Sequence, residues 1–261
     1  MMRVPGARED GRYARQEALP GVGEAGQRKL AKARVLVAGC GALGSSAAEL
    51  LARGGVGTID LVDFDSVELT NLQRQALIGE SDVGEPKARA VADALRRINS
   101  TIHVNAEIGR LDVRNVERLV IQADLVVDGF DNLASRYLLN DACVKHSVPW
   151  VFAAVAGTCG MTMPILPGQG PCLRCLFPTP AQEEKVLTAQ NAGLINTIPR
   201  AITALQVTHA IRILLGSWTD PVRLEILDVW DGCQFAEEVP RSSTCPACSE
   251  GRYDFLEPTG A

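Results

Sequence analysis

The sequence has few of the features that would indicate a membrane, secreted or nucleic-acid-binding protein. Aromatic residues make up 5% of its 261 residues, and only three residues are histidine. The longest uncharged apolar stretch, residues 148–157, is about half of what a bilayer-spanning helix requires. The charged N-terminus, MMRVPGARED, lacks the apolar core of a secretory signal. A formal net charge of −5 does not favour a nucleic-acid surface. These absences indicate a cytoplasmic protein with neither a membrane nor a nucleic acid as partner.

Apolar residues and cysteine are well represented. Hydrophobic residues make up 46% of the chain, which is ordinary for a soluble protein with a large core. No repeat, low-complexity tract or clear linker divides the sequence. We expect an N-terminal arm over residues 1–22, a single domain over residues 23–250 and a C-terminal tail over residues 251–261. In a reducing compartment, the eight cysteines indicate metal binding or catalysis before disulfides.

Predicted strands and helices alternate along the first 156 residues. This alternation predicts an α/β fold of the Rossmann-like, doubly wound kind, with a mostly parallel sheet and helices on both faces. After Gly157, glycine, proline and cysteine become frequent, and we expect one long helix followed by two strands. The predicted helices cover residues 23–33, 42–53, 87–98, 113–121, 135–146 and 198–215, and the predicted strands cover 35–38, 58–62, 102–106, 124–128, 149–156, 223–228 and 232–237.

The stretch VLVAGCGALGSS, residues 35–46, is typical of a nucleotide-binding loop between a strand and a helix. Gly39 and Gly41 are expected to let the backbone turn tightly, and Gly44 to let the helix pack close to its strand. Asp63 follows Gly44 by 19 residues, at the end of the next predicted strand, where an acid suits a ribose hydroxyl. NAD and ATP share these features. A tight turn without any ligand is the alternative.

Charged residues downstream favour ATP over a nicotinamide cofactor. Arg74 lies beyond the second strand, Lys87 opens a helix, Asp131 follows the strand that ends at Asp128, and Arg136 lies one turn further on. Ligands gather at such strand ends in an open parallel sheet. Singly, each residue is more often a solvated surface charge. Together, arginine and lysine side chains and a metal-binding carboxylate suit a triphosphate with Mg²⁺. A nicotinamide ring needs an uncharged pocket instead.

Two C-x-x-C pairs indicate a metal site near the C-terminus. Each pair can place two thiolates on one metal ion, and two pairs make a closed tetrahedral zinc site that pins the C-terminal segment. A redox C-x-x-C or disulfides are the alternatives. The predicted ligands are Cys172, Cys175, Cys245 and Cys248. Cys40 lies inside the glycine loop, where only a small side chain is required. The remaining cysteines are expected to be small core residues, namely Cys143, Cys159 and Cys233.

The sequence resembles the MoeB/ThiF (HesA/MoeB/ThiF) family, the bacterial relatives of ubiquitin-activating enzymes. The matching segments are RYARQ (12–16), the glycine loop, DFDSVELTNLQRQ (63–75), GEPKA (84–88), DNLASR (131–136) and the two cysteine pairs. The resemblance implies that residues 23–250 form an adenylation domain and that the protein is a homodimer. It implies that the protein uses ATP and Mg²⁺, with structural Zn²⁺, to adenylate the C-terminal glycine of a small ubiquitin-like (MoaD/ThiS-like) sulfur carrier. The pathway would supply a sulfur-containing cofactor, such as the molybdenum cofactor or thiamin.

The resemblance also assigns roles to individual residues. Gly41, Ala42 and Asp63 would hold the nucleoside; Asn71, Arg74 and Lys87 would contact the phosphates. Asp131 would lie at the Mg²⁺, and Arg15 would reach the triphosphate across a dimer interface. The predicted catalytic residues are thus Arg15, Arg74, Lys87 and Asp131. The predicted nucleotide site comprises Gly39, Gly41, Ala42, Gly44, Asp63, Asp65, Asn71, Arg74, Gln75, Lys87, Asp131 and Asn132.

One position departs from the family pattern. Many members carry a cysteine in the loop before the long helix, and the matching position here is Ala189. Simple adenylation is therefore expected, with sulfur delivered by another protein. The sequence ends 13 residues after Cys248, so no appended sulfurtransferase domain is expected. The alternatives are adenylation of a peptide or small-molecule carboxylate, a non-catalytic carrier-binding protein and an NAD-dependent oxidoreductase.

Overall fold

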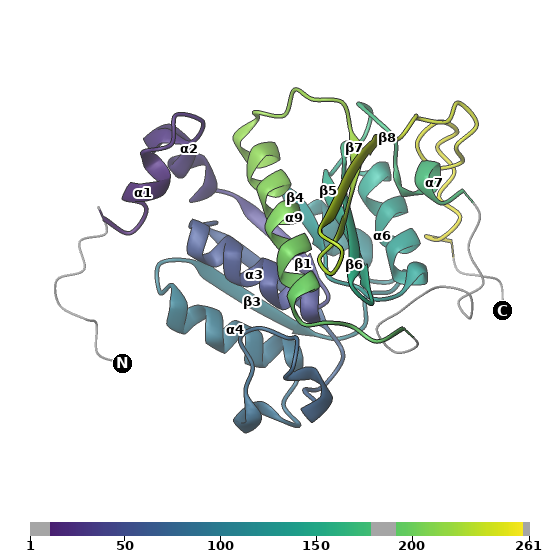
Figure 1. Ribbon diagram of the computed structural model, residues 1–261. Coiled ribbons are helices and arrows are strands. Elements are labelled where there is room, and N and C mark those ends of the chain that lie inside the picture. Colours follow the sequence, from purple (N-terminus) through teal and green to yellow (C-terminus); the bar gives the residue numbers. More distant parts are fainter. Residues whose placement is uncertain (1–10, 179–191, 258–261) are drawn as a thin grey trace.

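One eight-stranded sheet organises the molecule (Figure 1). The computed structural model describes residues 11–178 and 192–257. The strands lie in the order β3-β2-β1-β4-β5-β6-β7-β8; the pairs from β3 to β5 are parallel, and those from β5 to β8 are antiparallel. The strands are β1 (Arg34–Ala38), β2 (Thr58–Asp63), β3 (His103–Ile108), β4 (Leu125–Asp128), β5 (Trp150–Ala156), β6 (Cys159–Ile165), β7 (Arg223–Asp228) and β8 (Cys233–Glu238). The predicted mostly parallel, doubly wound sheet is confirmed.

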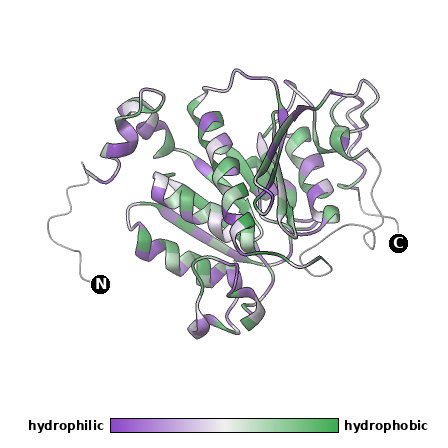
Figure 2. Ribbon diagram, viewed as in Figure 1, coloured by the Kyte–Doolittle hydropathy of each residue, from purple (hydrophilic) through white to green (hydrophobic). Residues whose placement is uncertain are grey.

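Helices cover both faces of the sheet because its strands are apolar on both sides. In β1, Val35 and Val37 pack with α3 and α4, while Leu36 and Ala38 pack with α5 and α6. The long helix α9 joins the α3 face, and Figure 2 shows hydrophobic residues along much of its length. The α-helices are α1 (Ala14–Glu17), α2 (Gly23–Leu30), α3 (Ala42–Gly54), α4 (Lys87–Ile98), α5 (Val116–Ile121), α6 (Leu133–Lys145), α7 (Leu173–Leu176) and α9 (Thr197–Leu215), and the short 3₁₀ turns are η2 (Leu69–Asn71) and η3 (Glu80–Asp82).

The predicted element bounds are close to the observed ones, with two informative differences. The helix predicted over 113–121 begins only at Val116, because the side chains of Asp112 and Asn115 hydrogen-bond the backbone of this segment and hold it as a turn. Strand β6 was not predicted. It follows β5 after Gly157 and Thr158, and its glycine and proline hide its strand character in the sequence.

The strand order predicts a ligand site at the carboxyl ends of the central parallel strands. After β1 the chain continues to β2 on one side of it, whereas β4 lies on the other side, so the strand order reverses at β1. Ligands of open α/β sheets bind at the carboxyl ends of the strands beside such a reversal. The glycine loop, Asp63 and the residues after Asp128 all lie at these strand ends. Among the helices of the described ranges, none is both long and apolar enough to cross a membrane.

Candidate functional site

The glycine loop between β1 and α3 is fixed by close backbone contacts. Gly39 has a φ of +94°, and a Cβ on it would lie 2.8 Å from the carbonyl oxygen of Gly129. A Cβ on Gly44 would overlap the carbonyl oxygen of Gly39, so the first turn of α3 packs directly on the loop. The steric role predicted for Gly44 is confirmed. Position 39 requires glycine for two reasons: its positive φ, and the closeness of the Gly129 carbonyl oxygen.

Gly41 has a different role from the one predicted. Its φ is −73°, and a Cβ on it would meet only the Gly129 oxygen, at an ordinary 3.6 Å. The prediction that Gly41 permits the tight turn is therefore wrong, because any residue adopts this backbone conformation. Gly41 precedes Ala42 at the start of α3, where no side chain of the described residues caps the helix. The uncapped amides of this first turn are available to an anion.

Asp63 ties the glycine loop to the end of β2. One carboxylate oxygen accepts a hydrogen bond from the backbone N–H of Cys40 at 2.6 Å, and the other accepts one from the N–H of Asp65 at 2.7 Å. Burial raises the pKa of Asp63, and these two hydrogen bonds oppose that rise. Each oxygen keeps a second lone pair, so the carboxylate can still accept a bond from a ribose hydroxyl.

Lys87 and Asp65 form an ion pair beside this carboxylate. The Lys87 ammonium lies 2.8 Å from an Asp65 carboxylate oxygen. In addition, the backbone N–H of Lys87 donates to the backbone carbonyl of Asp65 at 2.9 Å. The side chain of Lys87 is largely buried, which fixes the ammonium at the start of α4. An ammonium has three donors, so two are left for a ligand.

The segment after β2 carries the predicted phosphate contacts. Asn71 is buried, and its side-chain oxygen accepts a bond from the Glu68 N–H at 3.1 Å, which holds the 3₁₀ turn η2. Arg74 donates through Nη1 to the Thr70 carbonyl at 2.9 Å. Gln75 is 8% exposed, and its Oε1 has no hydrogen-bond partner among the described residues. Arg74 and Gln75 therefore keep side-chain polar groups for a ligand.

Asp131 and Asn132 begin α6. The Asn132 side-chain oxygen accepts a bond from the Ser135 N–H at 2.9 Å and so caps the helix. The amide of Asn132 lies 3.4 Å from a carboxylate oxygen of Asp131, which is itself exposed. This geometry assigns Asn132 a structural contact and leaves Asp131 free for a cation.

Arg136, which the sequence grouped with the phosphate-facing charges, is instead buried beneath the site. It is 5% exposed, and its Nε lies 2.8 Å from a carboxylate oxygen of Asp128, at the end of β4. Its Nη2 donates to the carbonyls of Ala153, at 2.7 Å, and Phe130. The expectation for Arg136 is wrong, because the register of α6 turns this side chain toward the sheet. Burial raises the pKa of Asp128, and Arg136 opposes that rise.

Gln206 of α9 completes this buried network and was not foreseen. Its Nε2 donates to the carbonyls of Asp128 and Val151, both at 2.9 Å. The network thus joins β4, β5, α6 and α9 directly under the loop that carries Asp131. The only sign of this role in the sequence is a glutamine within an apolar helix. Sequence alone does not show which strands its side chain bridges.

Arg15 lies at the far end of α3 from the glycine loop. Its neighbour Gln16 donates to the Gly54 carbonyl at 3.0 Å and to Gln27 at 2.7 Å, so α1 packs at the C-terminal end of α3. The 13 residues of α3 span about 20 Å. Within one chain the structure therefore does not bring Arg15 to the other predicted catalytic residues.

The two cysteine pairs converge at the opposite end of the molecule from α1 (Figure 1). All four sulfur atoms lie within 4.8 Å of one another; the Cys172–Cys245 and Cys175–Cys248 distances are 3.5 and 3.4 Å. Ligands about 2.3 Å from a tetrahedral zinc ion lie about 3.8 Å apart, so the cluster fits. The hydrogen bond from Cys172 lowers the pKa of Cys175 to about 4, whereas the pKa of Cys172 is raised, first by its hydrogen bond to Cys175, and burial raises the pKa of Cys245. A bound metal cation would favour the thiolate form of all four cysteines, because a coordinating thiol is deprotonated.

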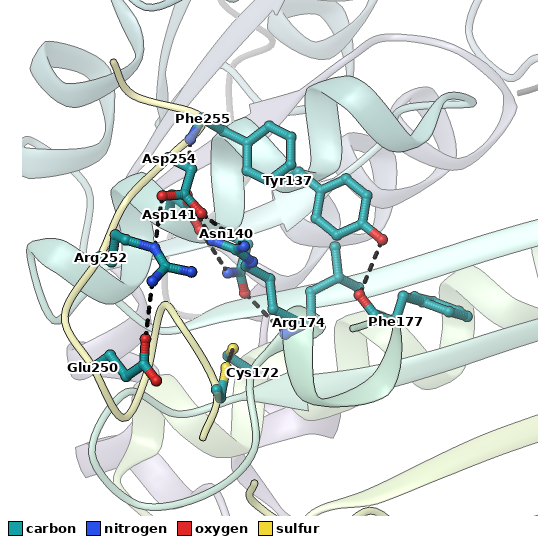
Figure 3. Close-up of polar contacts among 12 residues, drawn as sticks. Tyr137, Asn140, Asp141, Cys172, Arg174, Phe177, Glu250, Arg252, Asp254 and Phe255 are labelled. Atoms are coloured by element: carbon teal, nitrogen blue, oxygen red, sulfur yellow. Dashed lines mark hydrogen bonds and ion pairs between the residues drawn. The ribbon is translucent and has the colours of Figure 1, made fainter. Parts of the chain in front are cut away.

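A polar network beside the cysteines holds the C-terminal segment (Figure 3). Arg174, between the first two cysteines, pairs with Asp254 at 2.9 Å and lies 3.7 Å from buried Asp141 of α6. Phe255 stacks on Tyr137, with ring centroids 4.8 Å apart, and its N–H donates to Asp141 at 3.2 Å. Burial raises the pKa of Asp141 to about 6. The residues predicted as a tail thus pack on α6 as far as they are described.

The remaining cysteines divide into two groups. Cys143 is buried, as predicted, and Cys40 is buried in the glycine loop. Cys159 and Cys233 are exposed, so the expectation that they are core residues is wrong. Both lie at the ends of hairpin strands, opposite Asp228 in the sheet register. Ala189 lies outside the described residues.

Comparison with known proteins identifies the family. The ThiF family model matches residues 13–247. The sulfur carrier protein ThiS adenylyltransferase of Bacillus subtilis is 38% identical over 250 residues, 94% of this chain and 74% of that protein. The adenylyltransferase and sulfurtransferase MOCS3 of Anopheles gambiae is 42% identical over 246 residues, 93% of this chain and 55% of that protein. A crystal structure of E. coli MccB with ATP has the same fold, with a TM-score of 0.78, 24% identity and coverage of 93% of this chain and 75% of that chain. The chain belongs to the ThiF family.

Proposed function

We propose that this protein is an ATP-dependent adenylyltransferase that activates the C-terminal glycine carboxylate of a small ubiquitin-like sulfur carrier. The products are the carrier acyl-adenylate and pyrophosphate. The pathway supplies a sulfur-containing cofactor such as thiamin or the molybdenum cofactor, and the reaction takes place in the cytoplasm. The relatives named as a ThiS adenylyltransferase and as MOCS3 support this assignment. The observation that carries it is a set of donors with spare hydrogen-bonding capacity at one sheet edge: the first-turn amides of α3, which no described side chain caps, and the side chains of Arg74 and Lys87, each of which keeps further N–H donors after its one contact.

These donors match what adenylation requires. A terminal carboxylate is ionised at neutral pH, since its pKa is about 3.5, so the attack needs no general base. The protein must align the carboxylate with the α-phosphate and neutralise the charge that develops on the leaving group. Arg74 and Lys87 supply positive charge, and the first-turn amides of α3 supply fixed dipoles. Asp63 holds the glycine loop that precedes α3, and Asp65 holds the Lys87 ammonium.

The residues present fit Mg²⁺ and Zn²⁺ in different ways. Mg²⁺ prefers oxygen ligands, and Asp131 offers an exposed carboxylate at the start of α6. When bound there, Mg²⁺ would offset phosphate charge. The four cysteines form a closed set without an open position for substrate, which supports a structural role for Zn²⁺.

Dimerisation is part of the same proposal. Arg15 lies about one α3 length from the glycine loop of its own chain. We infer that the Arg15 that reaches the triphosphate belongs to a second copy of the chain. A symmetric dimer places each arginine beside the other subunit's site.

ATP–pyrophosphate exchange tests this function. The purified full chain is given Mg²⁺, ATP, labelled pyrophosphate and, in turn, each small carrier ending in Gly-Gly from the source genome. We expect label to enter ATP with one carrier, and Asp131→Asn to reduce that rate by about 100-fold. The matched control is Asp93→Asn, which removes an exposed carboxylate on α4. No exchange with any carrier, in protein that binds ATP, would contradict the proposal and favour another carboxylate or a non-catalytic role.

A further inference from the structure

The motif RYARQ, residues 12–16, contains more than the arginine that the proposed function uses. It overlaps α1 (Ala14–Glu17), a helix of a single turn. A helix this short is not stable by itself, because it fixes several backbone angles for very few hydrogen bonds. Its conformation therefore depends on contacts with the rest of the chain, and the other residues of the motif supply them.

Tyr13 anchors the start of α1 to the ends of α3 and α4. The Asn99 side-chain amide, at the end of α4, donates to the Tyr13 hydroxyl and to the Ala52 carbonyl of α3, both at 2.8 Å. Asn99 is fully buried, and its side-chain oxygen accepts a bond from the Thr101 hydroxyl at 2.8 Å. A Cβ on Gly55, which ends α3, would lie 2.6 Å from the Tyr13 ring. Tyr13 is thus held by a buried, fully paired amide that also joins α3 to α4.

Gln16 anchors the other end of the turn. Its Nε2 donates to the Gly54 carbonyl at 3.0 Å and to the Gln27 Oε1 at 2.7 Å. Gln27, on α2, is buried and donates to the same Gly54 carbonyl at 3.0 Å. The two glutamine side chains therefore bond to each other and share one acceptor at the end of α3. Arg12 adds a contact to the Ile98 carbonyl at 3.2 Å.

Arg15 differs from the other polar residues of the motif. Tyr13 and Gln16 lie three residues apart and share the inward face of the turn, whereas Arg15 is exposed. Among the described contacts, its side chain takes part in no hydrogen bond or ion pair. The chain thus fixes the backbone of Arg15 and leaves all five guanidinium N–H donors free. This arrangement suits an arginine that acts on another molecule.

We infer that Tyr13 and Gln16 are positioning residues, which anchor α1 so that Arg15 is presented to the nucleotide site of a second copy of the chain. The inference rests on the proposed function, in which Arg15 acts across a dimer. An arginine that comes from another subunit loses less conformational freedom on binding when its backbone is already fixed. The anchors therefore support the reaction of the neighbouring subunit and not that of the chain that carries them.

Hydrogen exchange on the full chain tests the anchoring without ATP or carrier. The double variant Tyr13→Phe/Gln16→Ala removes both side-chain anchors and leaves the buried residues that they bond to in place. We expect the backbone amides of residues 16–19, which bond within this turn, to lose their protection at short labelling times, while the amides of α3 keep theirs. Tyr253→Phe, whose hydroxyl makes no described contact, is the matched control and should exchange as the parent does. Unchanged protection of residues 16–19 in the double variant would overturn the inference.

Mixing of subunits shows which site the anchors serve. Alone, the double variant is expected to lower ATP–pyrophosphate exchange by about tenfold or more, because Arg15 is no longer held in place. After random subunit exchange with Asp131→Ala, about a quarter of the parent activity should return, since each mixed dimer contains one site with an intact Asp131 and an anchored Arg15. Mixing with Arg15→Ala should restore nothing, because no site then receives an anchored Arg15.

The opposite pattern would overturn the inference. If Tyr13 and Gln16 support the site of their own chain, mixing with Arg15→Ala restores activity and mixing with Asp131→Ala does not. Parent-like activity of the unmixed double variant would overturn it as well. A parent chain that shows no exchange with any carrier contradicts the proposed function instead, and the hydrogen-exchange result then still decides whether Tyr13 and Gln16 anchor α1.

Discussion

At the scale of single residues, the candidate site depends on groups that do not face the ligand. Asp128 and Arg136 are buried under the loop that carries Asp131, and together with Gln206 they join four elements. The sequence indicated an arginine near a phosphate site. It could not show that this arginine pairs with the aspartate eight residues before it, because that depends on how α6 is rotated against the sheet.

Removing Arg136 is predicted to destabilise the fold strongly. Arg136→Met leaves the Asp128 carboxylate buried without its cation, which costs about 3–5 kcal/mol of unfolding free energy. Chemical denaturation measures this change, and the double variant with Asp128→Asn should recover part of it. Arg118→Met, which breaks an exposed pair with Glu107, is the control and should cost about 1 kcal/mol or less. Equal effects of the two arginine substitutions would contradict the buried pair.

At the scale of elements, prediction succeeded where the signal is local. The helix predicted over 87–98 is observed with those bounds, since its apolar positions recur at helical spacing. Strand β6 was missed, because its pairing with β5 and β7 is a long-range property that Gly160 and Pro164 obscure. Likewise, exposure of Cys159 and Cys233 follows from their position at hairpin ends, which local composition does not reveal.

The segment that carries Cys245 and Cys248 is predicted to need a bound metal ion for its stability. Cys245→Ser removes one of four sulfur ligands, so we expect loss of bound zinc and a lower melting temperature. Elemental analysis and thermal melting of the purified full chain measure the two effects. Cys233→Ser is the matched control, because this exposed cysteine lies outside the cluster and should change neither. Full zinc content in Cys245→Ser would rule out the four-cysteine site.

At the scale of the whole molecule, the sequence predicts a site residue, Arg15, that the fold of a single chain does not bring to the others. The glycine loop, Asp63, Asp65, Lys87 and Asp131 meet at the predicted sheet edge, whereas Arg15 lies at the other end of α3. A motif shows which residues belong together in a family. It does not show whether one chain or two supply them.

Mixing two inactive variants tests the proposed second copy. Arg15→Ala and Asp131→Ala are each expected to be inactive in ATP–pyrophosphate exchange. If Arg15 acts across a dimer, random exchange of subunits gives mixed dimers with one intact site, and about a quarter of the parent activity should return. The unmixed variants, treated in the same way, are the control. Activity that stays at background after proven subunit exchange would mean that Arg15 does not act across a dimer.

The four-cysteine cluster also has a consequence for the order in which the molecule is made. Its two cysteine pairs are separated by 69 residues, which a ribosome adds in about 3–14 seconds at usual elongation rates. The parallel strands that carry the glycine loop, Asp63 and Asp128 have all been synthesised before the first cysteine pair. The nucleotide-binding half can therefore fold while the cluster is still open. Closure of the cluster comes late and fastens the most recently made segment onto a sheet that already exists.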